Sequence, residues 1–316
     1  MEKIYDVIIA GGSPGGYTAA LYCACAAMSV IVVKEPDSPG KIALTGDASN
    51  HPGFTDEIYG YELGEKMKKD AEKKGANTFC ARIDGLDMTG NVKRVSTSKG
   101  ELYSHCLILA MGVSPRKLFL PDETALTGNG ISYCAACNIS LYKNESVAVI
   151  GGGNSAISKA LALSSVCSRV FVICSENRLK AAPYLVDAAL ASGKVTFFYK
   201  TDVTKFLSGD GRISGIEIVD KTSGSKGRLF CKGVFIAIGQ VPNTKLCMPY
   251  VDTDENGYII AGETTKTNVS GVFAIGDMRT KPVRRIITAA ADGAVAAMYA
   301  EEYVRISQVS CHQLKS

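Results

Sequence analysis

Residues 5–16 read YDVIIAGGSPGG, and this stretch decides the fold. The apolar run at 5–10 predicts a buried strand, and the glycines that follow permit a tight turn into a helix. The small residue in the middle of such a turn lets the backbone approach a pyrophosphate, while the helix N-terminus adds the positive end of its dipole. The stretch therefore predicts the first strand, turn and helix of a dinucleotide-binding unit.

A second copy of this pattern begins at residue 147, where the chain reads VAVIGGGNSA. In each copy a further apolar strand run follows the helix, at 30–33 and at 170–173. The spacing from the first glycine to the residue that closes the unit, Glu35 or Ser175, is the same in both copies. Two complete strand–turn–helix–strand units at matched spacing are far more specific than one glycine motif. The expected fold class is α/β, with two Rossmann-like domains.

The first turn supplies most of the candidate cofactor contacts, which are Gly11, Gly12, Ser13, Pro14, Gly15 and Gly16. Ser13 in the middle position is a small departure from the usual pattern. Glu35 falls where a carboxylate accepts a ribose hydroxyl, which suits FAD; a solvated loop acid is the alternative. Gly112 follows the apolar run 106–110, and Gly276 and Asp277 follow the run 271–275, where ligands of open α/β sheets bind.

Cys134 and Cys137 form the one cysteine pair with redox spacing, Cys-x-x-Cys, and they precede the second glycine turn. A vicinal dithiol between two dinucleotide folds suggests electrons passing through a flavin into a disulfide, and a helix starting at the motif would lower a thiol pKa. The alternative is half of a zinc site, which needs a second ligand pair; the sequence has neither another Cys-x-x-Cys nor a His pair. We therefore expect catalytic cysteines and no metal.

Two prolines mark the expected domain crossings. Pro115 follows the strand run 106–110, and Pro242 follows the counterpart run 233–238. Such positions are typical of one domain inserted into another. We expect a discontinuous FAD-binding domain at 1–114 and 246–316, and an inserted pyridine-nucleotide-type domain at 115–245 that carries the Cys-x-x-Cys.

The composition of the 316 residues, 46% apolar and 21% charged, is ordinary for a soluble protein. The net charge of +4 does not argue for nucleic acid, although it tolerates an acidic protein partner. No apolar run reaches the ~20 residues of a membrane span, and the N-terminus enters a strand without a signal peptide. The 11 cysteines are therefore interpreted as reduced thiols of a cytoplasmic protein.

Together these motifs resemble the low-molecular-weight thioredoxin reductases. The resemblance covers nearly the whole length, from the first turn through Pro52-Gly53-Phe54, the Cys-x-x-Cys and the second turn to Gly276-Asp277 and residues 288–293. It implies FAD as cofactor, a homodimer, and thioredoxin as the disulfide substrate. Carried over residue by residue, it makes Cys137 the thiol nearest the flavin, Cys134 the thiol that attacks thioredoxin, and Asp277 a ligand of the ribityl chain.

Several positions depart from the family pattern on the flavin side. The family's proton-donating Asp after the second cysteine is Asn138 here, which has no titratable proton. The resemblance also implies cofactor contacts from Lys41, Asn50, Arg284, Arg285 and Ile286. Lys41 and Arg285 change the family's residues to cations, which would stabilise an anionic reduced flavin; solvent-facing side chains are the alternative.

The largest departure lies in the second unit. NADPH-dependent members carry His-Arg-Arg after the strand to grip the 2′-phosphate, and the aligned residues here are Cys174, Ser175 and Glu176. An acid in place of an arginine repels that phosphate, so NADPH is disfavoured. Either Glu176 accepts the 2′-hydroxyl of NADH, or the site is vestigial and electrons come from a protein. We favour reduced ferredoxin, because the chain is most like the ferredoxin-dependent members that lack NADPH motifs; NADH is the alternative.

Two further expectations concern function class and the C-terminus. One hypothesis is a flavin- and nucleotide-binding sensor that performs no turnover. The missing proton donor at Asn138 favours this hypothesis, and the intact Cys-x-x-Cys argues against it. The tail 305–316 is expected to follow the last helix. His312 in this tail is a candidate to stack on an exposed flavin face, and disorder is the alternative.

Overall fold

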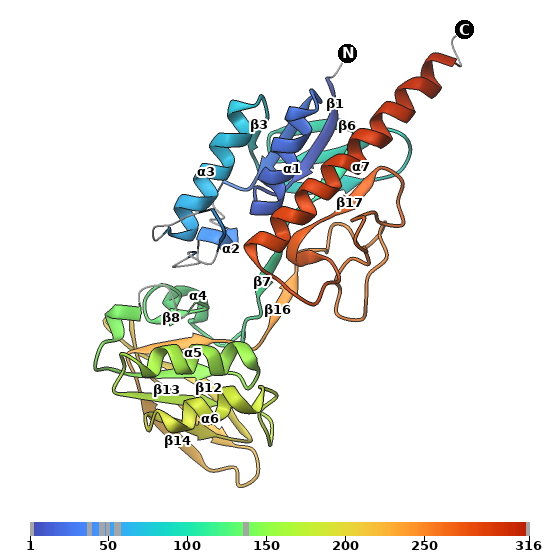
Figure 1. The fold of residues 1–316 in the computed structure, drawn as a ribbon. Coiled ribbons are helices and arrows are strands. Elements are labelled where there is room, and N and C mark those ends of the chain that lie inside the picture. Colours follow the sequence, from blue (N-terminus) through green and yellow to red (C-terminus); the bar gives the residue numbers. More distant parts are fainter. Residues whose placement is uncertain are drawn as a thin grey trace. The chain divides into compact units, whose positions relative to one another are not determined.

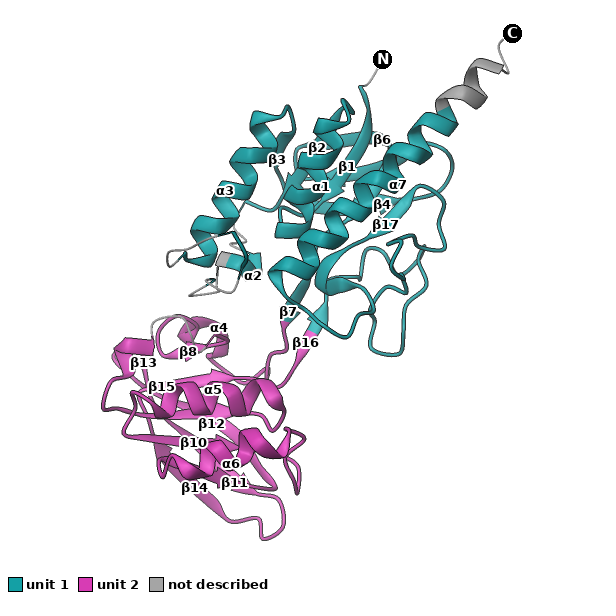
Figure 2. Cartoon of the chain, viewed as in Figure 1, with its two compact units in different colours: residues 1–114, 241–316 teal, residues 115–240 magenta. Residues whose placement is uncertain are grey.

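The computed structural model describes residues 3–36, 40–43, 48, 51–53, 58–134 and 139–313. The chain forms two units, one of residues 1–114 and 241–316 and one of residues 115–240 (Figure 2). The two crossings belong to the short paired strands β7 (Val113–Pro115) and β16 (Gln240–Pro242). The second crossing thus comes at 240/241, earlier than the expected 245/246.

Unit 1, residues 1–114 and 241–316, is built on a seven-stranded sheet in the order β3-β2-β1-β6-β5-β4, with β17 also paired to β6 (Figure 1). Its strands are β1 (Ile4–Ala10), β2 (Val30–Lys34), β3 (Asn77–Cys80), β4 (Ile83–Asp87), β5 (Lys93–Thr97), β6 (Gly100–Leu109) and β17 (Val272–Ala274). The start of β6 pairs antiparallel with β5, and its end pairs parallel with β17. The parallel part therefore carries the carboxyl edge at which a dinucleotide site is expected.

The helices of this unit are α1 (Pro14–Cys25), α2 (Gly40–Ala43), α3 (Gly60–Lys73) and α7 (Ile286–Gln313), with the 3₁₀ turn η2 (Gly276–Met278). Two of them, α1 and α7, touch almost backbone to backbone. A Cβ atom on Gly15 of α1 would lie 2.7 Å from the carbonyl oxygen of Ala289 in α7. Glycine is needed there because no side chain fits between the helices. Buried side chains such as Val7, Ile9 and Ile108 pack beneath them.

Unit 2, residues 115–240, repeats the arrangement with a five-stranded parallel sheet in the order β11-β10-β9-β15-β8. Its strands are β8 (Ile131–Ser132), β9 (Ser146–Ile150), β10 (Arg169–Ile173), β11 (Val195–Phe198) and β15 (Gly233–Ile236); a separate antiparallel sheet holds β12 (Thr201–Gly209), β13 (Arg212–Asp220) and β14 (Lys226–Phe230). The helices are α4 (Glu123–Leu126), α5 (Asn154–Ser164) and α6 (Pro183–Ala191), with the 3₁₀ helix η1 (Ile139–Tyr142). The two-Rossmann α/β prediction is confirmed.

One boundary prediction is wrong. Residues 305–313 of the expected tail do not follow the last helix, because α7 continues from Ile286 to Gln313. No glycine or proline interrupts residues 294–313, and an ion pair between Glu301 and Arg305 supports the helix one turn apart. Within the described residues no helix is long and apolar enough to cross a membrane.

Candidate active site

The first glycine turn joins β1 to α1, and Ser13 caps the helix. Its hydroxyl accepts the N–H of Gly16 at 3.1 Å, and its carbonyl accepts the N–H of Tyr17 at 2.8 Å. Pro14 takes the first helical turn, where its missing N–H costs nothing. A serine followed by a proline is a helix-start signal, so this capping role of Ser13 could be read from the sequence.

Gly11 and Gly12 have no side chains, so none covers the backbone of this turn. Gly11 has a φ of +119°, and a Cβ there would lie 2.5 Å from the carbonyl oxygen of Ala110. A Cβ on Gly12 would lie 3.1 Å from the side chain of Lys34. The turn and the α1 N-terminus thus form the cradle that a pyrophosphate needs.

Glu35 follows β2 directly, at the same edge of the sheet as the turn. The N–H of Gly11 donates to the carbonyl of Val33 at 2.9 Å, which places the turn beside the end of β2. The Glu35 carboxylate is exposed there. This position suits a contact with a ribose hydroxyl.

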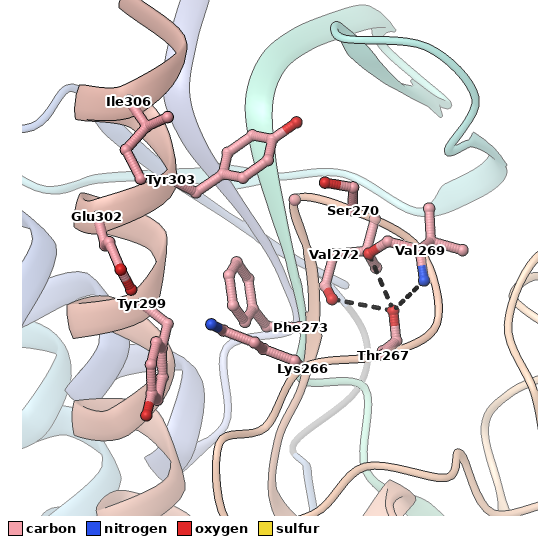
Figure 3. A pocket seen from close by; sticks show the side chains of 11 residues that line it. Lys266, Thr267, Val269, Ser270, Val272, Phe273, Tyr299, Glu302, Tyr303 and Ile306 are labelled. Atoms are coloured by element: carbon pink, nitrogen blue, oxygen red, sulfur yellow. Dashed lines mark hydrogen bonds between the residues drawn. The ribbon is translucent and has the colours of Figure 1, made fainter.

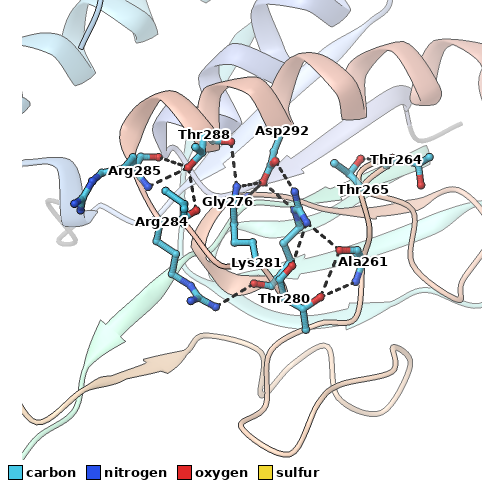
Figure 4. Close-up of polar contacts among 12 residues, drawn as sticks. Ala261, Thr264, Thr265, Gly276, Thr280, Lys281, Arg284, Arg285, Thr288 and Asp292 are labelled. Carbon is cyan, nitrogen blue, oxygen red and sulfur yellow. Dashed lines mark hydrogen bonds and ion pairs between the residues drawn. The ribbon is translucent and has the colours of Figure 1, made fainter. Parts of the chain in front are cut away.

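Gly276 and Asp277 begin η2 just after β17, also at the carboxyl edge. The N–H of Gly276 donates to Oδ2 of Asp292 at 2.8 Å (Figure 4). Nε of Arg284 donates to the carbonyl of Asp277 at 3.2 Å, and its guanidinium lies 4.2 Å from the ring centroid of Tyr258. Arg284 therefore supports the turn that carries Asp277.

Buried charges fix the same turn. Asp292 binds both Arg279, at 2.7 Å, and Lys281, at 2.8 Å, and all three side chains are less than a tenth exposed. Burial alone would raise the Asp292 pKa, but the hydrogen bonds from Arg279, Lys281 and Gly276 outweigh it and hold that pKa below its usual value. The Asp292 carboxylate is therefore ionised near neutrality.

Gly112 lies where β6 leads to the first crossing, with a φ of +63°. Its carbonyl accepts the N–H of Asn243 at 3.0 Å, and the carbonyl of Met111 accepts Nδ2 of Asn243 at 2.8 Å. Asn243 was not among the expected site residues, although its place directly after Pro242 marked a crossing. It ties the outgoing and returning chains together on the unit 1 side.

Cys134 is disulfide-bonded, and its backbone is held by Ser132. The Ser132 hydroxyl accepts the N–H of Cys134 at 3.1 Å and donates to its carbonyl at 2.8 Å. Cys137 and Asn138 lie outside the described residues. Residues 139–142 form the 3₁₀ helix η1, so the α-helix expected at the motif is absent from this described part.

The second glycine turn joins β9 to α5 and keeps the geometry of a nucleotide turn. Gly151 has a φ of +136°. The segment after β10 folds back onto the turn: the N–H groups of Lys180 and Ala181 donate to the carbonyl of Gly152 at 2.7 and 3.1 Å. Oδ1 of Asn154 accepts the N–H of Ala182 at 2.7 Å. The Asn154 side chain is thereby engaged by the protein itself.

Two lysines that were not expected contact Ser175 and Glu176, the residues aligned with the phosphate-binding arginines. Nζ of Lys221 donates to the hydroxyl of Ser175 at 3.0 Å, and Lys180 pairs with Glu176 at 3.2 Å. Lys180 stands four residues after Glu176, a spacing visible in the sequence, whereas Lys221 comes from a distant turn that gave no signal. The exposed Glu176–Lys180 pair offsets part of the repulsion that Glu176 alone would exert on a 2′-phosphate.

The other expected residues are placed unevenly. Ile286 opens α7. The side chains of Lys41 and His312 and all of Asn50 lie outside the described part of the chain. A helix from 286 to 313 rises about 1.5 Å per residue, so position 312 stands roughly 40 Å from Ile286. This argues against stacking of His312 on a flavin bound beside Ile286 of the same chain.

A small pocket of about 200 Å³ in unit 1 is separate from these residues. Its lining includes Lys266 and Tyr303 (Figure 3), together with Gly271 at the amino end of β17. Gly276 and Asp277 follow the opposite end of that strand. Among the described residues no cluster of three His, Cys, Asp or Glu side chains could hold a metal ion.

Comparison with known proteins agrees with this geometry. The family model described as pyridine nucleotide-disulphide oxidoreductase matches residues 5–293. A thioredoxin reductase of Peptoclostridium acidaminophilum is 35% identical over 96% of this chain and 98% of its own. The crystal structure of Lactococcus lactis thioredoxin reductase covers 95% of this chain and 99% of its own, with 32% identity and a TM-score of 0.81. A ferredoxin-flavin thioredoxin reductase from Clostridium acetobutylicum covers 97% and 100%, with 27% identity and a TM-score of 0.53.

The fold and the glycine turns define a flavoprotein disulfide oxidoreductase. Within that class the chain belongs to the low-molecular-weight thioredoxin reductase family. FAD is the cofactor, and unit 1 fits it: the bare turn at Gly11–Gly12, the carboxylate of Glu35 and the Gly276–Asp277 turn all lie at one sheet edge.

Proposed function

We propose that this chain reduces thioredoxin, using FAD and the Cys134/Cys137 pair. The observation that carries the proposal is the disulfide-bonded Cys134 on a unit inserted into an FAD-type unit. The names of the relatives support it, because they are thioredoxin reductases over nearly their whole length. FAD, when bound and reduced, supplies two electrons that open the disulfide.

The chain's own residues then carry out disulfide exchange. The Cys134 thiolate attacks one sulfur of the thioredoxin disulfide, forms a mixed disulfide and expels a thioredoxin thiolate, which takes up a proton. Cys137 next attacks the Cys134 sulfur, expels the second thioredoxin sulfur and restores the Cys134–Cys137 disulfide. Two electrons thus pass from the dithiol to thioredoxin.

We further propose reduced ferredoxin as the electron donor. Ser175 and Glu176 occupy the positions aligned with phosphate-binding arginines, and Asn154 is engaged by Ala182. The ferredoxin-flavin relative supports this donor, although its TM-score is lower than that of the Lactococcus enzyme. A ferredoxin near −400 mV and a thioredoxin near −270 mV differ by about 130 mV, or roughly 6 kcal/mol for two electrons.

NADH is the second candidate, because the Gly151 turn keeps its nucleotide-binding geometry. Glu176 follows the strand where an acid accepts a ribose 2′-hydroxyl. The relatives named simply thioredoxin reductase match this chain over nearly their full length. The donor therefore separates two otherwise identical proposals.

A homodimer and a cytoplasmic location complete the proposal, both from the family resemblance. The family's members are dimers, and exposed apolar side chains on the adjacent helices α1 and α7, Tyr22 and Met298, are available to an interface. Sedimentation of the FAD-loaded protein tests this point. A monomer at micromolar concentration would contradict it.

Anaerobic reduction of the FAD-loaded protein tests the function and the donor together. Ferredoxin, NADH and NADPH are each offered in turn, and thiols are counted on added thioredoxin. We expect ferredoxin to bleach the flavin and yield two thioredoxin thiols, and Cys134→Ser to abolish the second step only. Reduction by a nucleotide but not by ferredoxin would overturn the donor proposal. Flavin reduction without thioredoxin thiols would favour a sensor without turnover.

A further inference from the structure

Lys159 holds the peptide segment that leads into the redox disulfide. It lies in the second turn of α5, and its ammonium donates to the carbonyl oxygen of Tyr133 at 2.7 Å. That carbonyl belongs to the peptide bond that joins Tyr133 to Cys134. The cation is therefore one peptide unit away from the disulfide cysteine, and both lie within unit 2.

Two other side chains fix the same segment. Ser132 binds the N–H and the carbonyl of Cys134. The Tyr133 phenol donates to Oε1 of Glu123 at 2.6 Å, and burial together with the Glu123 carboxylate raises the pKa of Tyr133. The Tyr133 carbonyl is thus held in one orientation, and Lys159 with it.

The charge of Glu123 does not cancel that of Lys159 at the cysteine. Its carboxylate accepts the N–H groups of Leu118 and Phe119, at 3.1 and 2.7 Å, besides the phenol at the far end of the Tyr133 ring. Glu123 therefore sits beyond the ring, whereas Lys159 sits on the backbone beside Cys134. Lys159 is half-buried, so solvent screens it less than a surface lysine.

Peptide dimensions limit the distance between the cation and the sulfur. Because Lys159 Nζ binds the Tyr133 carbonyl oxygen, the Cys134 Sγ lies within about 8 Å of Nζ. At that range and at an effective dielectric constant of about 20 to 40, a unit positive charge lowers a thiol pKa by about one unit.

We propose that Lys159 is a positioning residue that holds Cys134 and stabilises its thiolate once the disulfide is open. The proposal rests on the proposed function, in which Cys134 attacks thioredoxin. Two electrons convert the disulfide into two sulfurs that carry two negative charges between them, and each charge needs a proton or a nearby cation. Lys159 balances the charge at Cys134, so only one proton is required. This matters where Asn138 replaces an acidic proton donor.

The test measures the Cys134 pKa directly and needs neither donor nor thioredoxin. The FAD-loaded protein carries Cys137→Ser, so Cys134 is the one motif thiol, and iodoacetamide alkylation is followed by mass spectrometry from about pH 5 to about pH 9. The variants are Lys159→Met, which removes the cation, and Lys159→Arg, which keeps it. Lys194→Met is the matched control, because Lys194 donates to the carbonyl of Ser164 at 3.0 Å at the other end of α5.

We expect Lys159→Met to raise the Cys134 pKa by about one unit. Lys159→Arg should bring the pKa most of the way back to the parent value, and Lys194→Met should leave the parent value unchanged. Equal pKa values in the parent protein and Lys159→Met would overturn the proposal. A rise that Lys159→Arg fails to reverse would assign Lys159 a packing role instead. A shifted pKa in a protein that never reduces thioredoxin would reject the proposed function and leave only the charge effect of Lys159 on the Cys134 thiolate.

Discussion

The carboxylate of Asp292 binds the guanidinium of Arg279 through two parallel hydrogen bonds, Nε to Oδ2 at 2.9 Å and Nη2 to Oδ1 at 2.7 Å. The same carboxylate accepts Lys281 Nζ and the N–H of Gly276, each at 2.8 Å (Figure 4). One buried anion thus pairs with two buried cations and fixes the turn before Asp277. The start of α7 is thereby joined to the end of β17.

Replacing Asp292 by Asn should destabilise unit 1 by about 3–5 kcal/mol, because it leaves two buried cations without a counter-charge. Urea unfolding of the FAD-loaded protein, followed by circular dichroism and flavin release, measures this loss. Glu301→Gln is the control on the same helix, since its pair with Arg305 is largely exposed and should matter by less than about 0.5 kcal/mol. Equal losses for the two variants would contradict the role of the cluster.

The Asp292 contribution should also depend on pH. The folded-state pKa of Asp292 is lowered, so its stabilisation is fully present above the unfolded value of about 3.9 and is lost as pH falls through the folded value. The stability difference between the parent protein and Asp292→Asn should be constant above about pH 5 and shrink below about pH 4. A difference that grows on acidification would show that the carboxylate is not the stabilising species.

The two repeated strand–turn–helix–strand units could be predicted from the sequence. Two apolar runs followed by glycine turns specify β1–α1–β2 and β9–α5–β10, because only a parallel sheet buries such runs on both faces. Contacts between segments far apart in the chain could not be predicted in this way. Lys221 meets Ser175, and Lys159 meets Tyr133, only after the chain has folded, and neither lysine differs locally from a solvated one.

The length of α7 shows a different limit. Residues 305–313 are polar enough to read as a tail, and yet they continue the helix because no breaker interrupts it. Helix continuation depends on the turn already formed, which residue types alone do not report. The expected role of His312 depended on that misplaced boundary.

The two motif cysteines should give different flavin spectra. Cys134→Ser leaves the Cys137 thiolate as the sulfur nearest the flavin, so we expect a long-wavelength charge-transfer band in the oxidised protein. Cys137→Ser should lack this band. Absorbance spectra across the pH range above the thiol pKa check both variants. A band confined to Cys137→Ser would exchange the two assigned roles.

The last prediction concerns the electron donor, and it is based on the contacts of Ser175 and Glu176. Arginine at both positions would meet a 2′-phosphate with forked, charge-assisted hydrogen bonds, and it would remove the acid that now pairs with Lys180. If the nucleotide site still binds a dinucleotide, the Ser175→Arg/Glu176→Arg variant should therefore increase the rate of flavin reduction by NADPH at least ten times more than the rate of reduction by NADH.

Stopped-flow flavin reduction measures both rates. Ser165→Arg/Glu145→Arg is the control, because it makes the same charge change at exposed positions near the amino edge of the unit 2 sheet. Ferredoxin should reduce the parent protein at a rate that falls as salt rises, because the net positive chain attracts an acidic partner. If both nucleotides remain inactive in the arginine variant while ferredoxin still works, the second glycine turn serves packing alone. Fast NADPH reduction of the unmodified protein would instead show that Lys180 and Lys221 already provide the phosphate contact, and the ferredoxin proposal would fall.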